Sequence, residues 1–284
     1  MIIFTAREKS LDKLKTTIRP YSGINLQLKE LWQHRELLYF FAWRDIRVKY
    51  KQTALGITWA LLQPLGLMLI FVLVFSRSSL AQASAGLRYE LFVLSGLVLW
   101  NLFHTSVSHA SESMITNAGI IKKIYFPRLV IPLSALVSAL VDFSIGLLLL
   151  FIFCMIYGQP VHINAILYFP IAILLVLITA FGMGTLLGAL NVKFRDFRYA
   201  LPFLLQMMFF ATQIIYPATL VKQQWIQYLF ALNPLNAALE LFRFPFGTPV
   251  NEMVVVTGIV SAFVLALTGL LYFKKTESYF ADIV

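Results

Sequence analysis

Long apolar stretches alternate with short polar ones along most of this chain. The clearest is residues 55–75, LGITWALLQPLGLMLIFVLVF, which contains no charged residue. A helix of that length rises roughly 30 Å, at about 1.5 Å per residue, and so matches the hydrocarbon core of a bilayer. The pattern recurs and predicts six membrane spans, at about 55–75, 91–111, 131–157, 163–190, 199–220 and 253–273.

A different pattern precedes the first span. Residues 1–25 form a polar, basic tail, and residues 26–52 carry apolar side chains at steps of three and four, with charges mostly on the other side. We expect an amphipathic helix that lies in the headgroup zone, although an ordinary soluble helix would show the same period. Residues 53–284 then form the six-span domain. The apolar positions of the amphipathic segment are Leu28, Leu31, Trp32, Tyr39, Trp43, Ile46 and Tyr50.

The connection between the fifth and sixth predicted spans, about 221–252, is longer than a turn requires. Asn233-Pro234 separates two apolar pieces, 224–232 and 235–242, each too short to cross a bilayer. We interpret them as a re-entrant or interfacial helical pair on the outer side, with a folded external loop as the alternative. The predicted fold is therefore an all-α membrane protein with six spans, an N-terminal interfacial helix and an outer helix pair.

Composition supports the membrane assignment, and charge gives the orientation. The chain of 284 residues is 60% hydrophobic and only 13% charged, whereas soluble domains are about 25% charged. Nineteen of the 23 Lys and Arg residues fall in the N-terminal segment, the second and fourth connections and the C-terminus. Basic residues accumulate on the cytoplasmic side, so both termini are predicted to be cytoplasmic.

Motifs for bond-making chemistry are missing from the sequence. No Gly is followed by Lys, so there is no P-loop, and no HExxH or Cys/His metal spacing occurs. We predict no catalytic residue, metal or cofactor in this chain; if transport is ATP-driven, the ATPase, with its ATP and Mg²⁺, must be another chain. The single Cys154 is interpreted as packing, and the polar first twenty residues lack the apolar core of a signal peptide.

Two ionisable residues and a small-residue repeat stand out within the spans. Asp142 and His104 are predicted at similar depths in neighbouring spans, and a buried ionisable group is usually paired, so we expect a structural contact between them. A proton relay is the functional alternative. Ala180, Gly184 and Gly188 recur every four residues, which allows close helix packing.

Neutral polar and aromatic residues share helical faces in the first and fifth spans. Polar groups inside a span usually face protein or water, so we hypothesise that these faces line a conduit, while packing alone is the simpler alternative. The positions are Gln52, Trp59, Gln63 and Gly66 in and before the first span, and Gln206, Phe209, Phe210, Gln213 and Tyr216 in the fifth.

The connection between the second and third spans, residues 117–132, is short, amphipathic and basic. It carries Lys122, Lys123 and Arg128 and is closed by Pro127 and Pro132. Such a loop can dock on a cytoplasmic partner, but its cations also simply satisfy the positive-inside rule.

Several stretches resemble the ABC-2 permease family, and most of all its exporters of lipid-linked polysaccharide such as O-antigen, capsule or teichoic acid. They are WRDIRVKYKQTALGITWALLQP, LVLWNLFHTSVSHASESMITNAGIIKKIYFPRLVIPL, NVKFRDFRY and the Asn-Pro pair, within residues 25–280. The resemblance implies a homodimer paired with two copies of an ATPase subunit. It implies ATPase contacts from the N-terminal amphipathic segment and residues 117–128, and hence coupling roles for Arg44, Asp45, Asn117, Lys122, Lys123, Tyr125 and Arg128.

The expected function is export of a polyprenyl-diphosphate-linked polysaccharide, driven by that ATPase. An ABC-2 exporter of a small drug or lipid and a proton-coupled secondary transporter are the alternatives. A membrane-embedded enzyme is disfavoured because Glu112, Asp142, Glu240 and Glu252 are too scattered for a catalytic cluster.

Overall fold

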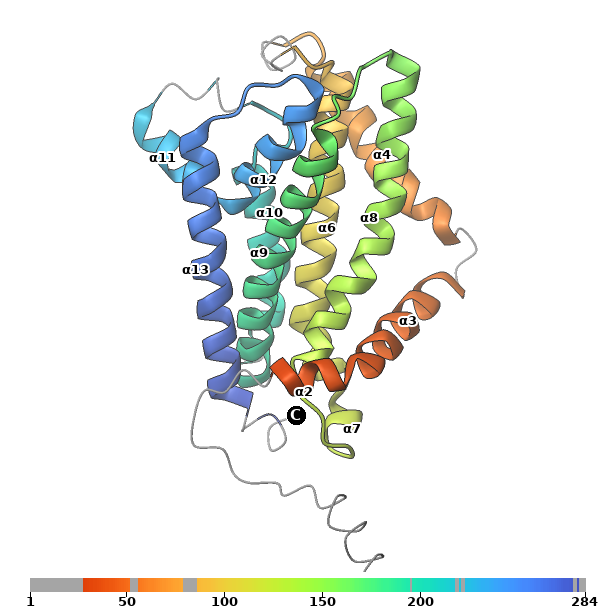
Figure 1. Cartoon of the computed structure of the whole chain (residues 1–284), viewed down its shortest axis with the longest axis vertical. Helices are drawn as coiled ribbons and strands as arrows, with labels where there is room; N and C mark the ends of the chain where they lie inside the picture. The colour runs from red at the N-terminus through yellow and green to blue at the C-terminus, as the bar shows by residue number, and fades with distance from the viewer. Residues whose placement is uncertain are drawn as a thin grey trace, which may run out of the picture.

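The computed structural model describes residues 28–51, 56–78, 86–194, 196–217, 220, 223–277 and 280. Every regular element within these ranges is a helix (Figure 1). The predicted tail and Gln52 lie outside them. The helices are α2 (Leu28–Gln33), α3 (Arg35–Lys51), α4 (Gly56–Phe75), α6 (Tyr89–Thr116), α7 (Ala118–Ile121), α8 (Val130–Tyr157), α9 (Ala165–Lys193), α10 (Phe197–Ala211), α11 (Gln224–Leu232), α12 (Pro234–Arg243), the 3₁₀ turn η2 (Phe244–Phe246) and α13 (Glu252–Thr276).

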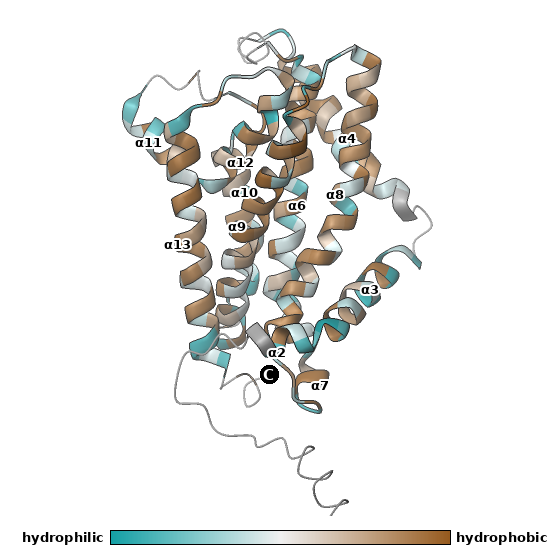
Figure 2. Ribbon diagram, in the orientation of Figure 1, coloured by the Kyte–Doolittle hydropathy of each residue, from teal (hydrophilic) through white to brown (hydrophobic). Residues whose placement is uncertain are grey.

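Five of the helices are long and apolar enough to cross a membrane. They are α4, α6, α8, α9 and α13, which confirms five of the predicted spans (Figure 2). The predicted fifth span, 199–220, is wrong in its extent. Helix α10 has only 15 residues and stops at Ala211, after which Thr212 takes an extended backbone. The following stretch, TQIIYP, is rich in β-branched residues and reaches a proline, which weakens helix propagation.

Helix α6 lies at the centre of the bundle. Of its most apolar stretch 72% is buried, compared with 11% for α4 at the edge. Helices α8 and α9 pack along α6, and α13 packs along α9 (Figure 1). The end of the bundle that carries α2, α7 and the C-terminal end of α13 is called the basic end below, and the opposite end, which carries α11, is called the far end.

Small residues on α9 set its distance to two neighbouring helices. A Cβ atom on Gly184 would lie 2.7 Å from the Cβ of Ala110 on α6. A Cβ on Gly182 would lie 2.6 Å from the backbone of Ala266 on α13. The predicted close packing is confirmed, and it occurs within one chain on two sides of α9.

The amphipathic segment is helical but is broken in two at His34. Helix α3 packs against α8 and buries Phe41 and Ala42, whereas Tyr39 and Trp43 stack on each other and point outward. The Arg47 guanidinium lies 5.3 Å from the Trp43 ring centroid. An exposed aromatic pair beside cations is the arrangement expected of a helix in the headgroup zone.

Candidate functional site

Aromatic rings from three helices meet at one side of the bundle. The Phe209 ring of α10 lies 5.3 Å from the Trp100 ring of α6, edge to face, between centroids. It also stacks on Phe71 of α4, with 6.1 Å between the centroids. Aromatic pairs contribute about 0.5–1.5 kcal/mol beyond their buried area, so this cluster fastens α10 to α4 and α6. We call this side the α4–α10 face.

A cavity of about 80 Å³ lies beside the ring cluster, between α4 and α6. Its polar atoms come from neutral amides and an imidazole rather than from carboxylates or ammonium groups. Hydrogen-bonding groups inside a membrane span are stable only where they contact protein or water. The lining residues are Gln63, Pro64, Leu67, Leu97, Trp100, Asn101 and His104.

Most of the predicted path residues lie on α4 and α10. Trp59 and Gln63 are exposed on α4, and Gln206 and Phe210 are exposed on α10. Phe209 is half-buried in the ring cluster and links the two helices. The structure therefore leaves the first four residues accessible and brings Gln63 and Phe209 next to Trp100 of α6.

The predicted face of the fifth span does not continue past Ala211. Gln213 and Tyr216 lie beyond the end of α10, in a turn rather than on its helical face. Gln213 is 3% exposed, and its side chain belongs to the far end of the bundle. The prediction treated residues 206–216 as one helix, and the helix ends too early for that.

Sequence reasoning missed the contribution of α6 to this face. Trp100 and Asn101 border the small cavity together with His104. The signal was present in the stretch WNLFHTSVSH, where neutral polar residues recur at steps of three and four inside a span.

A hydrogen-bonded cluster joins α3 to the end of α6 at the basic end. Arg44 Nη1 donates to Asn117 Oδ1 over 2.8 Å, and Arg44 Nη2 forms an ion pair with Asp45 Oδ1 at 2.7 Å. The guanidinium also lies 5.0 Å from the ring centroid of buried Phe41. Three of the predicted coupling residues, Arg44, Asp45 and Asn117, are thus in one network.

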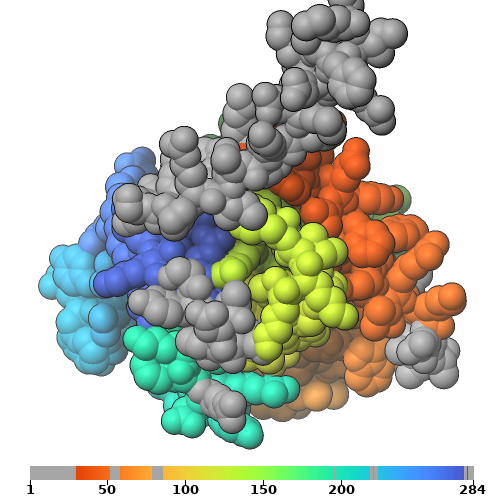
Figure 3. Space-filling view, turned by 90° about the horizontal axis from the view of Figure 1, so that it is seen from below, coloured from red at the N-terminus to blue at the C-terminus, as the bar shows by residue number. Residues whose placement is uncertain are grey.

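The remaining predicted coupling residues form a second group on the loop that contains α7. Lys122, Lys123 and Tyr125 are exposed, and with Arg128 they line a cavity of about 180 Å³. Figure 3 shows this loop near the middle of the basic end, between α3 and α13. Phe126, at the base of the loop, packs in a core cluster with Phe41 and Phe273. A movement of the loop would therefore reach both α3 and α13.

Asp142 does not pair with His104 as predicted. Its carboxylate accepts hydrogen bonds from Lys49 Nζ and Tyr50 Oη, both on α3. Burial, together with the Asp142 carboxylate, raises the pKa of Tyr50 above its ordinary value. The prediction considered only groups inside the spans, but α3 rises along α8 far enough to bring its last turn to Asp142 (Figure 1).

Asp142→Asn is expected to loosen α3 from the bundle. Asparagine keeps the shape but removes the charge that Lys49 balances, and hydrogen bonds to charged groups contribute about 1.5–3 kcal/mol. Amide hydrogen exchange in α3 should rise by an order of magnitude or more. Glu112→Gln, a matched change at an exposed position of α6, should leave α3 exchange unchanged; equal protection in the Asp142→Asn variant would show that the contact does not hold α3.

At the far end, the side chain of Arg243 lies next to the segment that follows the end of α10. The side chain is buried, with 4% exposed, and its guanidinium lies 3.6 Å from the Phe92 ring centroid. It donates to Ser95 Oγ and the Phe92 carbonyl on α6, and to the Gln213 and Ile214 carbonyls beyond α10. Backbone carbonyls inside a membrane protein need such partners, because water is scarce there.

The Asn-Pro pair starts α12 and also contacts the end of α10. Asn233 Oδ1 accepts from Leu235 N as the helix cap, and Pro234 occupies the first turn. Asn233 Nδ2 donates to Thr212 Oγ1 over 3.0 Å, and Asn236 Oδ1 accepts from Gln213 N over 2.8 Å. The predicted helical pieces on both sides of the break are confirmed as α11 and α12.

The groups on the α4–α10 face are suited to binding. Among the described side chains, no cluster of three or more His, Cys, Asp or Glu residues could hold a metal ion. The groups available along the α4–α10 face are amides, an imidazole and aromatic rings, which can hydrogen-bond hydroxyl groups and stack on apolar ring faces.

Comparison with known proteins gives the family. The chain is 29% identical over 250 residues to an O-antigen export system permease protein RfbA of Klebsiella pneumoniae, covering 88% of this chain and 95% of the relative. The RfbA protein of Myxococcus xanthus is 29% identical over 259 residues, covering 89% and 97%. The polysialic acid transport protein KpsM of Escherichia coli is 28% identical over 202 residues, covering 70% and 77%. The family model for ABC-2 type transporters matches residues 36–246, so this chain belongs to the ABC-2 type transporter family.

Proposed function

We propose that the chain is the membrane-spanning permease subunit of an ABC exporter for polyprenyl-diphosphate-linked polysaccharide, of the O-antigen type. Similarity over almost the full length to O-antigen export permeases supports this substrate class. The observation that carries the proposal is the α4–α10 face, where neutral amides and aromatic rings are gathered and α4 has no charged residue.

The chemistry of that face fits a sugar chain. A glycan presents hydroxyl groups at its edges and C–H groups on its ring faces, so it is bound by amides together with aromatic rings. Fixed charges along the route would hold the chain or its counterions and slow its passage. We place Trp59, Gln63, Trp100, Asn101, Gln206, Phe209 and Phe210 along this route.

Two copies of the chain would enclose the route. Helix α4 buries only 11% of its apolar stretch within one chain, yet it carries the polar Gln63 on an exposed side. Polar groups in a span usually face protein or water. We therefore propose a homodimer in which the α4–α10 faces of both subunits meet around the substrate.

The basic end is the proposed cytoplasmic, ATPase-binding side of the inner membrane, with both termini on it. Exposed Lys122, Lys123, Ile124 and Tyr125 offer charged and apolar contacts on one loop. The ATPase, which would carry ATP and Mg²⁺, would press on this loop when it closes. The cluster of Arg44 with Asn117, together with the Asp142 contacts, would transmit the movement to α6 and α8.

Deleting the gene is expected to make lipid-linked glycan accumulate at the cytoplasmic face, and restoring the chain should reverse this. The Gln206→Ala/Phe210→Ala variant, expressed in the deletion strain, should export about tenfold less glycan than the wild-type chain. This factor corresponds to about 1.4 kcal/mol of lost binding. The measurement is surface glycan per cell at equal protein level. The control is Leu148→Ala/Ile152→Ala, an exposed pair on α8 with the same spacing. Normal surface glycan in the deletion strain would refute the function, and normal export by the Gln206/Phe210 variant would refute the route.

A further inference from the structure

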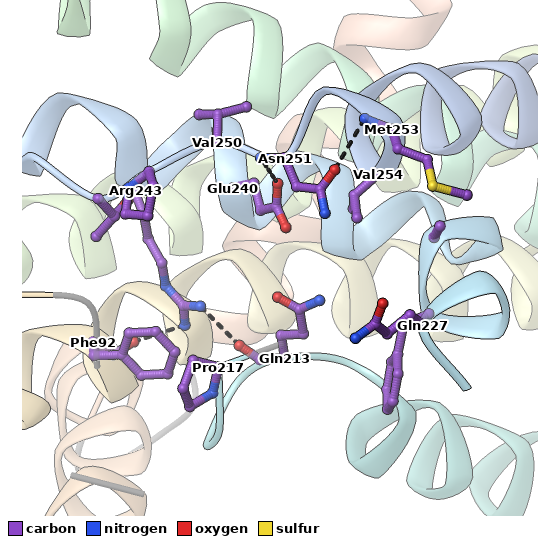
Figure 4. A pocket seen from close by; sticks show the side chains of 14 residues that line it. Phe92, Gln213, Pro217, Gln227, Glu240, Arg243, Val250, Asn251, Met253 and Val254 are labelled. Atoms are coloured by element: carbon purple, nitrogen blue, oxygen red, sulfur yellow. Dashed lines mark hydrogen bonds between the residues drawn. The ribbon is translucent and has the colours of Figure 1, made fainter. Parts of the chain in front are cut away.

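A larger cavity, of about 370 Å³, lies at the far end of the chain (Figure 4). It is bounded by α6, α11 and α12, the turn after α10, and the segment that leads into α13. Pockets for small molecules span about 300–1,000 Å³, so the cavity is large enough for one such ligand. It is separate from the small cavity on the α4–α10 face, because the two share no lining residue.

Two residues that line this cavity each carry a buried polar atom with no hydrogen-bond partner among the described residues. These atoms are Gln213 Nε2 and Thr248 Oγ1, on side chains that belong to residues 3% and 6% exposed. An unsatisfied buried polar atom destabilises the fold, and native proteins hold few of them without a reason. Figure 4 shows the Gln213 amide pointing into the cavity, toward Glu240 and Gln227.

The remainder of the lining favours a neutral ligand with several hydroxyl groups. The carboxyl group of Glu240 lines the cavity and accepts from Asn251 N over 2.8 Å. The guanidinium of Arg243 is directed to Ser95 Oγ and three backbone carbonyls, so it does not form an anion site. Phe230 and Met253 supply apolar walls. Among the described lining residues, a phosphate would find a carboxyl group and no available cation.

We propose that this cavity binds one pyranose ring of the exported glycan as the chain leaves the bundle. The ring hydroxyls would accept from Gln213 Nε2 and exchange hydrogen bonds with Thr248 Oγ1 and the Glu240 carboxyl group. The apolar face of the ring would rest on Phe230. The inference rests on the proposed function, and it assigns an outer sugar site that is distinct from the conduit.

Binding of simple sugars by the full-length chain in lipid nanodiscs tests the site. The probes are the methyl α-pyranosides of glucose, mannose and galactose, with sodium phosphate for comparison, and binding is followed by saturation-transfer NMR. Gln213→Met/Thr248→Val should weaken pyranoside binding at least about tenfold. The melting temperature should stay the same or rise, because both side chains lose an unsatisfied polar atom and keep their approximate size. Thr268→Val, a matched change on the exposed side of α13, should change neither pyranoside binding nor the melting temperature.

The results separate this site from the proposed function. A wild-type chain that binds none of the three pyranosides, binds phosphate more tightly, or binds pyranosides as well in the double variant would overturn the sugar site. A large drop in melting temperature in the double variant would also overturn it, since the two side chains would then serve the fold. If the deletion strain fails to export glycan but the purified chain binds no pyranoside, the exporter function is supported and only the proposed sugar site is refuted.

Discussion

Arg243→Met is expected to destabilise the chain by roughly 3–5 kcal/mol, the largest effect of any single polar replacement considered. The guanidinium satisfies the Phe92, Gln213 and Ile214 carbonyls in a place that water hardly reaches. Methionine fills much of the same volume but leaves these acceptors without donors, at a cost of about 1–3 kcal/mol each. Thermal unfolding of purified protein, together with its level in the membrane, measures the effect.

Two further variants make the Arg243 result specific. Arg243→Lys keeps the charge but cannot reach four acceptors with one ammonium group, so it should fall between wild type and methionine. Arg88→Met removes an exposed arginine whose ion pair with Glu90 spans 3.7 Å and whose guanidinium lies 4.2 Å from the Tyr157 ring centroid, and it should change stability by about 1 kcal/mol or less. Equal melting temperatures for Arg243→Met and Arg88→Met would mean that the buried network contributes nothing.

Gly182→Val is expected to force α9 and α13 apart and to reduce the amount of folded protein strongly. Even the Cβ of the new side chain would lie 2.6 Å from the backbone of Ala266, and backbone atoms cannot rotate out of the way. Overpacking of this kind destabilises the folded state by about 1–3 kcal/mol, and by more where neither helix can shift. Fluorescence-detected size-exclusion chromatography of membrane extracts shows the loss as a smaller, broader peak.

Gly66→Val is the matched control for that change. Gly66 also lies within a membrane helix, but a Cβ added there meets no atom within 4 Å. Its chromatographic profile should resemble that of the wild type. If Gly182→Val behaved like Gly66→Val, the contact between α9 and α13 would not depend on a glycine.

The long spans could be predicted from hydropathy because length and apolar content are local properties. The Asn-Pro break was predictable for the same reason, since a proline after a capping residue starts a helix wherever it occurs. The early end of α10 was not. It depends on Arg243, Asn233 and Asn236, which lie more than twenty residues away in the chain and supply the hydrogen bonds that the helix no longer makes.

The candidate site was predictable only in part. Trp59, Gln63, Gln206 and Phe210 could be proposed as path residues from the sequence because each stands out as polar or aromatic within its own span, and the structure leaves all four exposed. Asp142 was correctly expected to have a partner, but Lys49 and Tyr50 come from a helix that the prediction placed at the membrane surface. The sugar cavity rests on side chains from five separate segments, and no local pattern in the sequence joins them.

The brevity of α10 has a consequence for the energy of transport. Fifteen residues rise about 22 Å, some 8 Å less than a hydrocarbon core of about 30 Å. The buried turn after α10, held by Asn233, Asn236 and Arg243, fills this difference in place of a longer helix. On the route proposed above, a hydroxyl-rich polymer moving along α10 would follow a helix for only about three quarters of the hydrocarbon thickness and would meet the backbone and amide groups of the turn after α10 over the rest.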